Sequence, residues 1–173
     1  MRFTIIMATL AAAISMPAVA ADKEAPAALA IPAPVPGQGQ VVFFRPSAFV
    51  GSAIRCTVRE DGKMIGRAGN GRYFVIAAAP GKHSFTTKTE ATDTLNVEVE
   101  PDETTYVKCK IGMGVWAGRP NLSPGSAEEF AASSNKLKLA DADELAKAIA
   151  DDQAEQAKKA AKAASADKAG ASN

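Results

Sequence analysis

The most constraining feature of this sequence is a repeated pattern between residues 40 and 111, where short stretches with every second residue apolar alternate with turn dipeptides. The turn dipeptides are Asp61-Gly62, Asn70-Gly71, Pro80-Gly81 and Pro101-Asp102. Asp-Gly and Asn-Gly tolerate the positive φ angles of tight hairpins, and Pro-Gly fits the centre of a type II turn. Strands at such regular spacing are typical of a small sandwich or barrel. We therefore predict an all-β domain, an antiparallel β-sandwich of about seven strands.

Two segments are apolar throughout. Residues 41–44 are expected to form a strand that is covered on both faces or leads into a sandwich core, and residues 73–77 to form a central strand. The other strands are expected to be solvated on one face, because apolar and polar residues alternate along them. They cover residues 54–59, 64–67, 82–88, 95–100 and 106–111. After residue 112, glycine and proline predict a loop that extends to Pro124, with room for one more strand at Val115-Trp116.

The sequence beyond this loop predicts helices on either side of a short strand. Ser126 followed by Glu129 forms a capping box, which favours a short helix. Residues 136–139 alternate and could close the sheet at an edge. Asp141 with Glu144 is a second capping signature, and strong helix formers continue from there to about residue 164.

This last helix has few residues that could anchor it. Leu145 and Ile149 are its only large apolar residues, so its first two turns could dock on the domain. The remaining Ala/Lys/Glu segment has nothing to bury, so we expect a solvated or fraying helix there.

The chain ends are predicted to lie outside the β domain. Arg2, an apolar run over residues 3–16 and Ala18-Val19-Ala20 follow one another as in a signal peptide cleaved after Ala20. An uncleaved anchor is the alternative, but the run is shorter than the roughly 20 residues that span a bilayer. Because no cysteine follows the cleavage site, we expect a periplasmic or secreted protein without a lipid anchor. The expected organisation is a signal peptide (1–20), a Pro/Ala-rich linker (21–37), a β-sandwich domain (38–140) and a helical, partly disordered tail (141–173).

Composition and motifs argue against several functional classes. The formal net charge of +1 gives no electrostatic reason to expect a nucleic-acid partner. His83 is the single histidine, which excludes a multi-histidine zinc site, and its place beside Phe85 on a strand face indicates a half-buried structural histidine. Acidic residues at the turns lack the spacing of a calcium loop, and no helix follows the glycine-rich segment to hold a phosphate. We therefore predict no enzymatic activity, no metal and no cofactor.

Five arginines recur along the first half of the β pattern. They are Arg45, Arg55, Arg59, Arg67 and Arg72. On outward strand positions they could line a basic face for an anionic polymer. Arginine at such positions also protects sheet edges against pairing with other chains, and we favour that interpretation.

The two cysteines, Cys56 and Cys109, fall at inward positions of two alternating strands. In a chain addressed to an oxidising compartment, this placement favours a structural disulfide. Two buried free thiols are the alternative. Redox catalysis would call for a Cys-x-x-Cys pair, which the chain does not contain.

A third candidate feature lies in the glycine-rich segment after the last clear strand. Trp116 stands there together with Met113, Val115 and Arg119. An aromatic residue with flexible neighbours at the end of a sandwich could form a contact patch, for which we name Met113, Trp116 and Arg119. A tryptophan that caps the core is the alternative interpretation.

An ordered series of segments resembles a known family of exported bacterial proteins. The series is Val41-Val42-Phe43-Phe44-Arg45-Pro46-Ser47, Gly51-Ser52-Ala53, Asp61-Gly62-Lys63-Met64-Ile65-Gly66, Gly71-Arg72-Tyr73-Phe74, Pro80-Gly81-Lys82-His83 and Thr105-Tyr106-Val107. In order and spacing it resembles the domain of unknown function 2846, and its single pieces are similar to PEGA and carboxypeptidase-regulatory-like modules. The resemblance implies a transthyretin-like or prealbumin-like β-sandwich on a cell-envelope protein and brings no catalytic residues. The chain departs from the family pattern by its cysteine pair and by lacking the lipoprotein cysteine of many relatives.

These observations lead to one functional hypothesis and one alternative. The first is a non-enzymatic exported cell-envelope module that binds a protein or a cell-wall polymer. The alternative is a small-ligand-binding periplasmic domain that uses the loop end near Trp116. An enzyme ranks third, because the chain displays no reactive centre.

Overall fold

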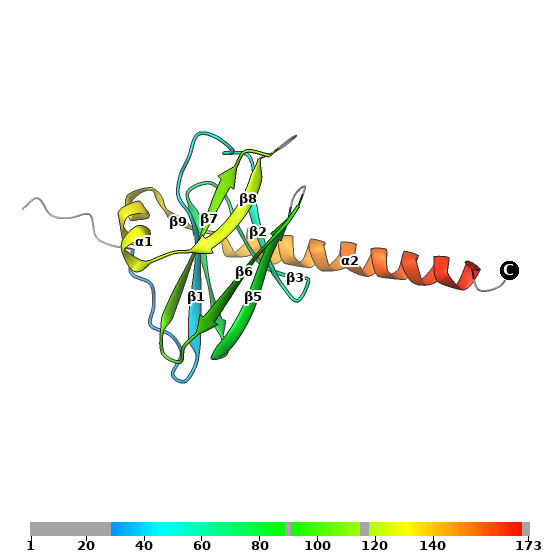
Figure 1. Cartoon of the computed structure of the whole chain (residues 1–173), viewed down its shortest axis with the longest axis horizontal. Coiled ribbons are helices and arrows are strands. Elements are labelled where there is room, and N and C mark those ends of the chain that lie inside the picture. Colours follow the sequence, from blue (N-terminus) through cyan, green and yellow to red (C-terminus); the bar gives the residue numbers. More distant parts are fainter. Residues whose placement is uncertain (1–28, 89–90, 115–117, 171–173) are drawn as a thin grey trace, which may run out of the picture.

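The computed structural model describes residues 29–88, 91–114 and 118–170 (Figure 1). Nine strands form two packed sheets in this part of the chain. The five-stranded sheet has the order β8 (Arg119–Pro124), β7 (Thr104–Gly112), β1 (Gly39–Arg45), β4 (Arg72–Ala78) and β9 (Lys138–Leu139). The four-stranded sheet has the order β3 (Lys63–Ala68), β2 (Cys56–Glu60), β5 (Gly81–Lys88) and β6 (Thr92–Val99). The fold is therefore mostly β and sandwich-like, as predicted, with a helix at its C-terminal end.

The main core lies between the two sheets and is centred on three aromatic rings. Phe43 of β1 stacks on Phe74 of β4, with ring centroids 4.9 Å apart. The ring of Phe85, from β5 of the opposite sheet, meets Phe43 edge-on at 4.9 Å. Offset-stacked and edge-to-face contacts of this kind stabilise a core beyond the area they bury. Phe43 thus joins the sheets at their centre.

A second, smaller core covers the outer face of the five-stranded sheet. Helix α1 (Ala127–Ser133) presents Phe130 there, and its ring packs edge-on against Phe44 at 5.5 Å and Tyr73 at 5.3 Å. A single-turn helix, η1 (Ser134–Lys136), follows α1. Because this layer covers one face and the opposite sheet covers the other, every residue of β1 is buried. The continuous apolar run at residues 41–44 is explained by this double cover.

The expectation of a purely antiparallel sandwich of about seven strands was wrong in two respects. The five-stranded sheet is mixed, because β1 pairs parallel with β7 and β4 pairs parallel with β9. Residues 119–124 form strand β8, although their prolines predicted a loop. Pro120 and Pro124 are tolerated because β8 lies at the edge of its sheet, where a missing N–H group breaks no ladder on the open side.

Several local predictions were confirmed. Asp61 and Gly62 both have positive φ, 49° and 78°, in the β2–β3 hairpin turn. The Ser126 hydroxyl accepts a hydrogen bond from the Glu129 amide at 3.2 Å and so caps α1. Residues 138–139 close the sheet at an edge as β9.

Helix α2 (Ala142–Gly170) starts on the sandwich and projects away from it (Figure 1). Its first turns lie against β3 of the four-stranded sheet. Leu145 packs on the edge of the main core, as expected. Among the described helices, none combines the length and the apolar character needed to cross a membrane.

Candidate functional site

Cys56 and Cys109 form a disulfide, as predicted. The bond joins β2 of the four-stranded sheet to β7 of the five-stranded sheet, with Cα atoms 6.5 Å apart. Both cysteines are buried in the main core. The bridge therefore ties the two sheets together beside the end of the sandwich at which the β1–β2 loop (residues 46–55) lies.

Arg45, at the end of β1, is buried and organises the β1–β2 loop from within. Its guanidinium donates hydrogen bonds to the carbonyl oxygens of Gly51, at 2.8 Å, and Ile54. Burial lowers the pKa of this side chain. Because a buried cation needs its donors satisfied, these carbonyls hold the loop in place. Arg45 was therefore wrongly grouped with the outward-facing arginines.

The β1–β2 loop also packs against the end of β7. Gly51 has a φ of +73°, and a Cβ atom added there would lie 2.7 Å from Cγ2 of Ile111. A Cβ atom on Gly118 would lie 2.4 Å from Cδ1 of Ile54. These close approaches leave no space for side chains, which explains the glycines at both positions. The β1–β2 loop thus packs against the end of β7 and against Gly118 at one end of the sandwich, which we call the loop end.

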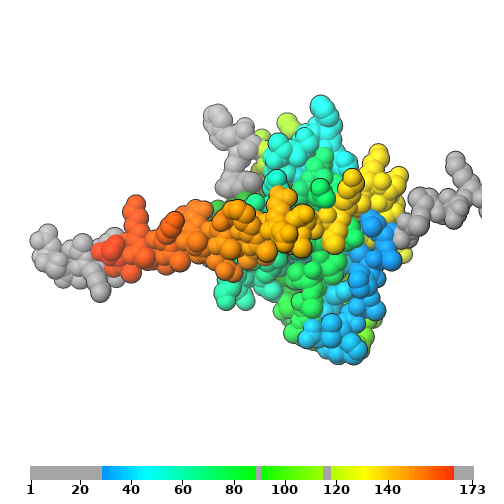
Figure 2. Space-filling model, turned by 180° about the vertical axis from the view of Figure 1, so that it is seen from behind, coloured from blue at the N-terminus to red at the C-terminus, as the bar shows by residue number. Residues whose placement is uncertain are grey.

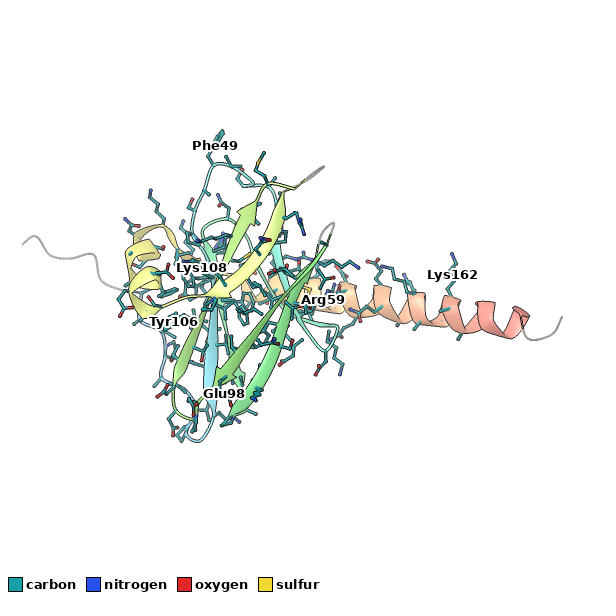
Figure 3. All side chains as sticks on the ribbon, viewed as in Figure 1. Phe49, Arg59, Glu98, Tyr106, Lys108 and Lys162 are labelled. Carbon is teal, nitrogen blue, oxygen red and sulfur yellow. A yellow bond between two sulfur atoms is a disulfide. The ribbon has the colours of Figure 1, made fainter. Side chains whose placement is uncertain are left out.

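Three large apolar side chains are nevertheless exposed at the loop end. Phe49 is 97% exposed, Val50 is 66% exposed and Met113 is 89% exposed. Figure 3 shows Phe49 at the tip of the β1–β2 loop, far from Glu98 at the other end of the sandwich. We call these three residues the apolar tip. Large apolar side chains grouped on a surface mark interaction sites.

The predicted contact patch overlaps this site in part. Met113 belongs to it, and Arg119 lies half-buried at the start of β8, opposite Gly112 of β7. Trp116 lies outside the described residues. Phe49 and Val50 were missed, although the sequence carries a signal for them: two large apolar residues stand in a turn-rich segment where nothing predicts a strand.

The outward arginines form a second candidate surface, on the side of the four-stranded sheet that faces α2. Arg55 donates to Glu144 at 2.5 Å, and Arg59 binds both carboxylate oxygens of Asp152. Arg67 donates to the hydroxyl of Thr57 at 3.2 Å. Beyond Ile149, where the sequence offers nothing apolar to bury, the contact of α2 with the sheet is polar. We call Arg55, Arg59 and Arg67, together with Arg72 at the start of β4 of the five-stranded sheet, the arginine face.

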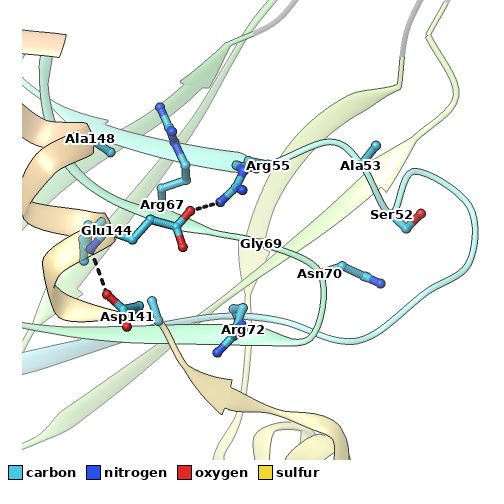
Figure 4. Close-up of a pocket in the computed structure, with 12 residues that line it drawn as sticks. Ser52, Ala53, Arg55, Arg67, Gly69, Asn70, Arg72, Asp141, Glu144 and Ala148 are labelled. Atoms are coloured by element: carbon cyan, nitrogen blue, oxygen red, sulfur yellow. Dashed lines mark hydrogen bonds and ion pairs between the residues drawn. The ribbon is translucent and has the colours of Figure 1, made fainter. Parts of the chain in front are cut away.

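A cavity of about 280 Å³ opens where the arginine face meets the start of α2 (Figure 4). Its walls include Arg55, Arg67 and Arg72 together with Asp141 and Glu144. Figure 4 shows Glu144 reaching toward Arg55, while the carboxylate of Asp141 accepts the Glu144 amide at 2.9 Å. The cavity is therefore lined by three arginines, of which Arg55 pairs with a carboxylate that the chain itself supplies.

His83 has a structural environment. Its Nδ1 lies 2.6 Å from a carboxylate oxygen of Glu60, its Nε2 lies 2.8 Å from the carbonyl oxygen of Ala79, and its ring stacks on Phe85. Burial alone would lower the pKa of His83, but the Ala79 carbonyl and the Glu60 carboxylate together raise it above the ordinary value. The half-buried strand histidine expected from the sequence is what the structure shows.

Comparison with known proteins gives a family and one relative. Residues 36–120 match the model of the family described as "Protein of unknown function (DUF2846)". The chain belongs to the DUF2846 family over these residues. This DUF2846 protein is 27% identical over 135 residues to an uncharacterized protein of Haemophilus influenzae, and the aligned region covers 78% of this chain and 80% of that relative.

The family predicted from the ordered series of strand and turn segments is thereby confirmed, whereas similarity to PEGA or carboxypeptidase-regulatory-like modules is not shown. No solved structure matches this DUF2846 protein significantly. The matched residues span β1 to the start of β8, so they include the β1–β2 loop, the disulfide and the arginine face.

Proposed function

We propose that this DUF2846 protein is a non-enzymatic, exported module of the cell envelope that binds a partner protein through its loop end. The apolar tip is the observation that carries the proposal. Phe49, Val50 and Met113 expose apolar surface to solvent, although burying such a side chain is worth about 1.5–3 kcal/mol. A partner that covers them would recover this free energy.

The way the loop end is held supports the same proposal. The buried guanidinium of Arg45 and the close packing of Gly51 on Ile111 fix the loop that carries Phe49. Binding by a preorganised loop loses less conformational entropy than binding by a flexible one. Aromatic and methionine side chains are also enriched at the centres of protein interfaces.

Export and the absence of catalysis belong to the proposal as well. Disulfides persist in oxidising compartments, and the Cys56–Cys109 bond accords with the signal-peptide pattern of residues 1–20. The single histidine is engaged by Glu60 and a backbone carbonyl, which favours a structural role. A transthyretin-like strand topology, which the family resemblance implied, is part of this proposal too.

Photo-crosslinking in the exported full-length protein tests the proposal. A photoreactive phenylalanine analogue replaces Phe49 in one variant and Met113 in a second, and a third carries it at Glu98 as a matched control at the opposite end. We expect the same adduct mass from the two loop-end positions and no such adduct from the control. Adducts that are equally abundant at all three positions, or that differ between Phe49 and Met113, would refute the proposed site.

A substitution experiment tests whether the side chain of Phe49 contributes to binding of the partner. Phe49→Ser should weaken the crosslink formed from Met113, while the melting temperature of the protein stays unchanged because the ring makes almost no contact with the fold. An undiminished crosslink would show that Phe49 takes no part in binding.

A further inference from the structure

Helix α2 is divided into two halves of opposite charge. Residues 142–156 contain five acidic residues and one lysine, whereas residues 157–170 contain four lysines and one aspartate. The first half lies against the sandwich, and the second half projects beyond it, as Figure 2 shows and as the position of Lys162 in Figure 3 illustrates. The half that docks is thus the acidic one.

The docking contacts are mostly charged and polar. Asp152 accepts a two-pronged hydrogen bond from Arg59, Glu144 pairs with Arg55, and Gln156 donates to the carbonyl oxygen of Gly62 at 3.1 Å. The hydrogen bond from Arg59 lowers the pKa of the Asp152 carboxyl, and the nearby charge of Arg67 adds to the effect. The carboxylates of α2 therefore sit in the positive potential of the arginine face.

Apolar contacts between α2 and the sandwich are few. Over residues 142–165, whose side chains are described, no residue is fully buried, and Leu145, Ala148 and Ile149 are half-buried. The side chains of Arg55 and Glu144 are 53% and 60% exposed, so salt screens their attraction. Leu145 touches only the edge of the main core, whose buried members all belong to the sandwich. The helix can therefore leave the arginine face without unfolding the sandwich.

The arginine face would then present free guanidinium groups. In the described part of the chain, the carboxylates paired with these arginines come from α2 and not from the sheet itself. Guanidinium groups bind carboxylates and phosphates through paired hydrogen bonds, so an acidic ligand matches them. Glu144 and Asp152 stand eight residues apart on the helix, which corresponds to about 12 Å. One small anion cannot span both positions, but a chain of repeated acidic groups can.

We propose that the arginine face is a binding site for a linear polyanion, and that the acidic half of α2 is an internal occupant which the polyanion displaces. This site is independent of the apolar tip, because it lies beside α2 and uses charge rather than apolar contact. The cavity beside Glu144 is where one acidic group of the ligand would replace the carboxylate of that residue.

Binding measurements with two defined probes test the proposal: inorganic polyphosphate, which carries phosphates, and polygalacturonate, which carries carboxylates. In the Glu144→Gln/Asp152→Asn variant, loss of both ion pairs should weaken the docking of α2 on the arginine face. Binding of at least one probe should then become about tenfold tighter. Glu98→Gln is a control that removes one negative charge far from α2. Equal affinities for the wild type, the double variant and this control would overturn the proposal.

Two further variants separate the arginine face from the projecting lysines. Arg55→Gln/Arg67→Gln should abolish the gain in affinity when it is combined with the double variant. Lys158→Gln/Lys159→Gln/Lys162→Gln should preserve the gain. The opposite result, in which only the lysine variant loses the gain, would assign polyanion binding to the projecting half of α2 and refute the site.

Hydrogen exchange measures the displacement of α2 directly and also shows whether each variant is folded. Addition of the tighter-binding probe to wild-type protein should speed amide exchange across residues 144–156 while β1 and β4 remain protected. Protection of α2 that is unchanged at saturating probe would refute displacement.

Discussion

The disulfide offers the sharpest quantitative prediction. Cys56 and Cys109 are 53 residues apart in the sequence, and both are buried in the core. In the chain-entropy model, a cross-link that closes a loop of this length stabilises the folded state by about 4 kcal/mol, because it restricts the unfolded chain. That is a large part of the roughly 5–15 kcal/mol that stabilises a domain of this size.

The perturbation is reduction without any change of sequence. Because the sulfurs are buried, the protein is unfolded in denaturant with reductant and then refolded under reducing conditions. Denaturant titrations of the oxidised and reduced forms give the two free energies of unfolding, and alkylation with mass spectrometry confirms the thiol count. We expect the reduced form to be less stable by about 4 kcal/mol and to melt about 15–30 °C lower.

A double Cys56→Ala/Cys109→Ala variant controls for effects of the reductant, because its stability should not respond to it. A difference below about 1 kcal/mol between oxidised and reduced protein would refute the reasoning. It would mean that the unfolded chain is already restricted between the two cysteines or that the fold does not depend on the cross-link between its sheets.

Three further predictions concern the histidine, a glycine and the helix. The folded-state pKa of His83 is raised, so its contribution to stability is complete below its unfolded pKa of about 6.5 and is lost as pH rises through the folded pKa. In an NMR titration of this single histidine, Glu60→Gln should lower the midpoint. An unmoved midpoint would show that Glu60 does not raise the pKa of His83. A Cβ atom on Gly66 would lie 2.1 Å from the ring of Phe74, so Gly66→Ala should lower the free energy of unfolding by about 1–3 kcal/mol. Gly69→Ala is the control and should change it by much less, because the nearest atom there is 3.6 Å away. Equal losses in denaturant titrations would show that the ring of Phe74 moves freely. A chain that ends after Asp151 loses the carboxylate bound to β2 but keeps the half-buried apolar residues of α2, so calorimetry should show a drop of only a few degrees in melting temperature. A larger drop would mean that residues beyond Asp151 contribute more to the fold than exposed polar contacts do.

The sequence by itself determined most of the local structure. Alternation and turn dipeptides placed the strands, because the side-chain period of a strand and the positive φ of its turns are properties of neighbouring residues. The hairpin at Asp61-Gly62 and the cap at Ser126 follow from the same local chemistry. The cysteine pairing was also accessible, since the chain holds only two cysteines and both point inward.

Only the tertiary structure decided which segments lie next to each other. The parallel pairing of β1 with β7 joins strands about 60 residues apart, and no local pattern specifies such a partner. Strand β8 could not be predicted, because Pro120 is compatible with a strand only at the edge of a sheet, and the sequence does not say that this segment lies at an edge. The sequence predicts that the side chain of Arg45 points outward, but in the structure it is buried and donates hydrogen bonds to carbonyl oxygens of the β1–β2 loop.

The candidate sites divide in the same way. Met113 could be named from the sequence because it stands in a glycine-rich segment after a clear strand, but Phe49 joined it only once the β1–β2 loop was placed beside the end of β7. The docking of the first turns of α2 was predicted from Leu145 and Ile149, but the contact at Asp152 was not. Hydrophobic periodicity indicates only apolar contacts, whereas Asp152 binds Arg59, a residue 93 positions away. Charge pairing at that distance along the chain depends on the fold, because only the fold brings the two side chains within hydrogen-bonding reach.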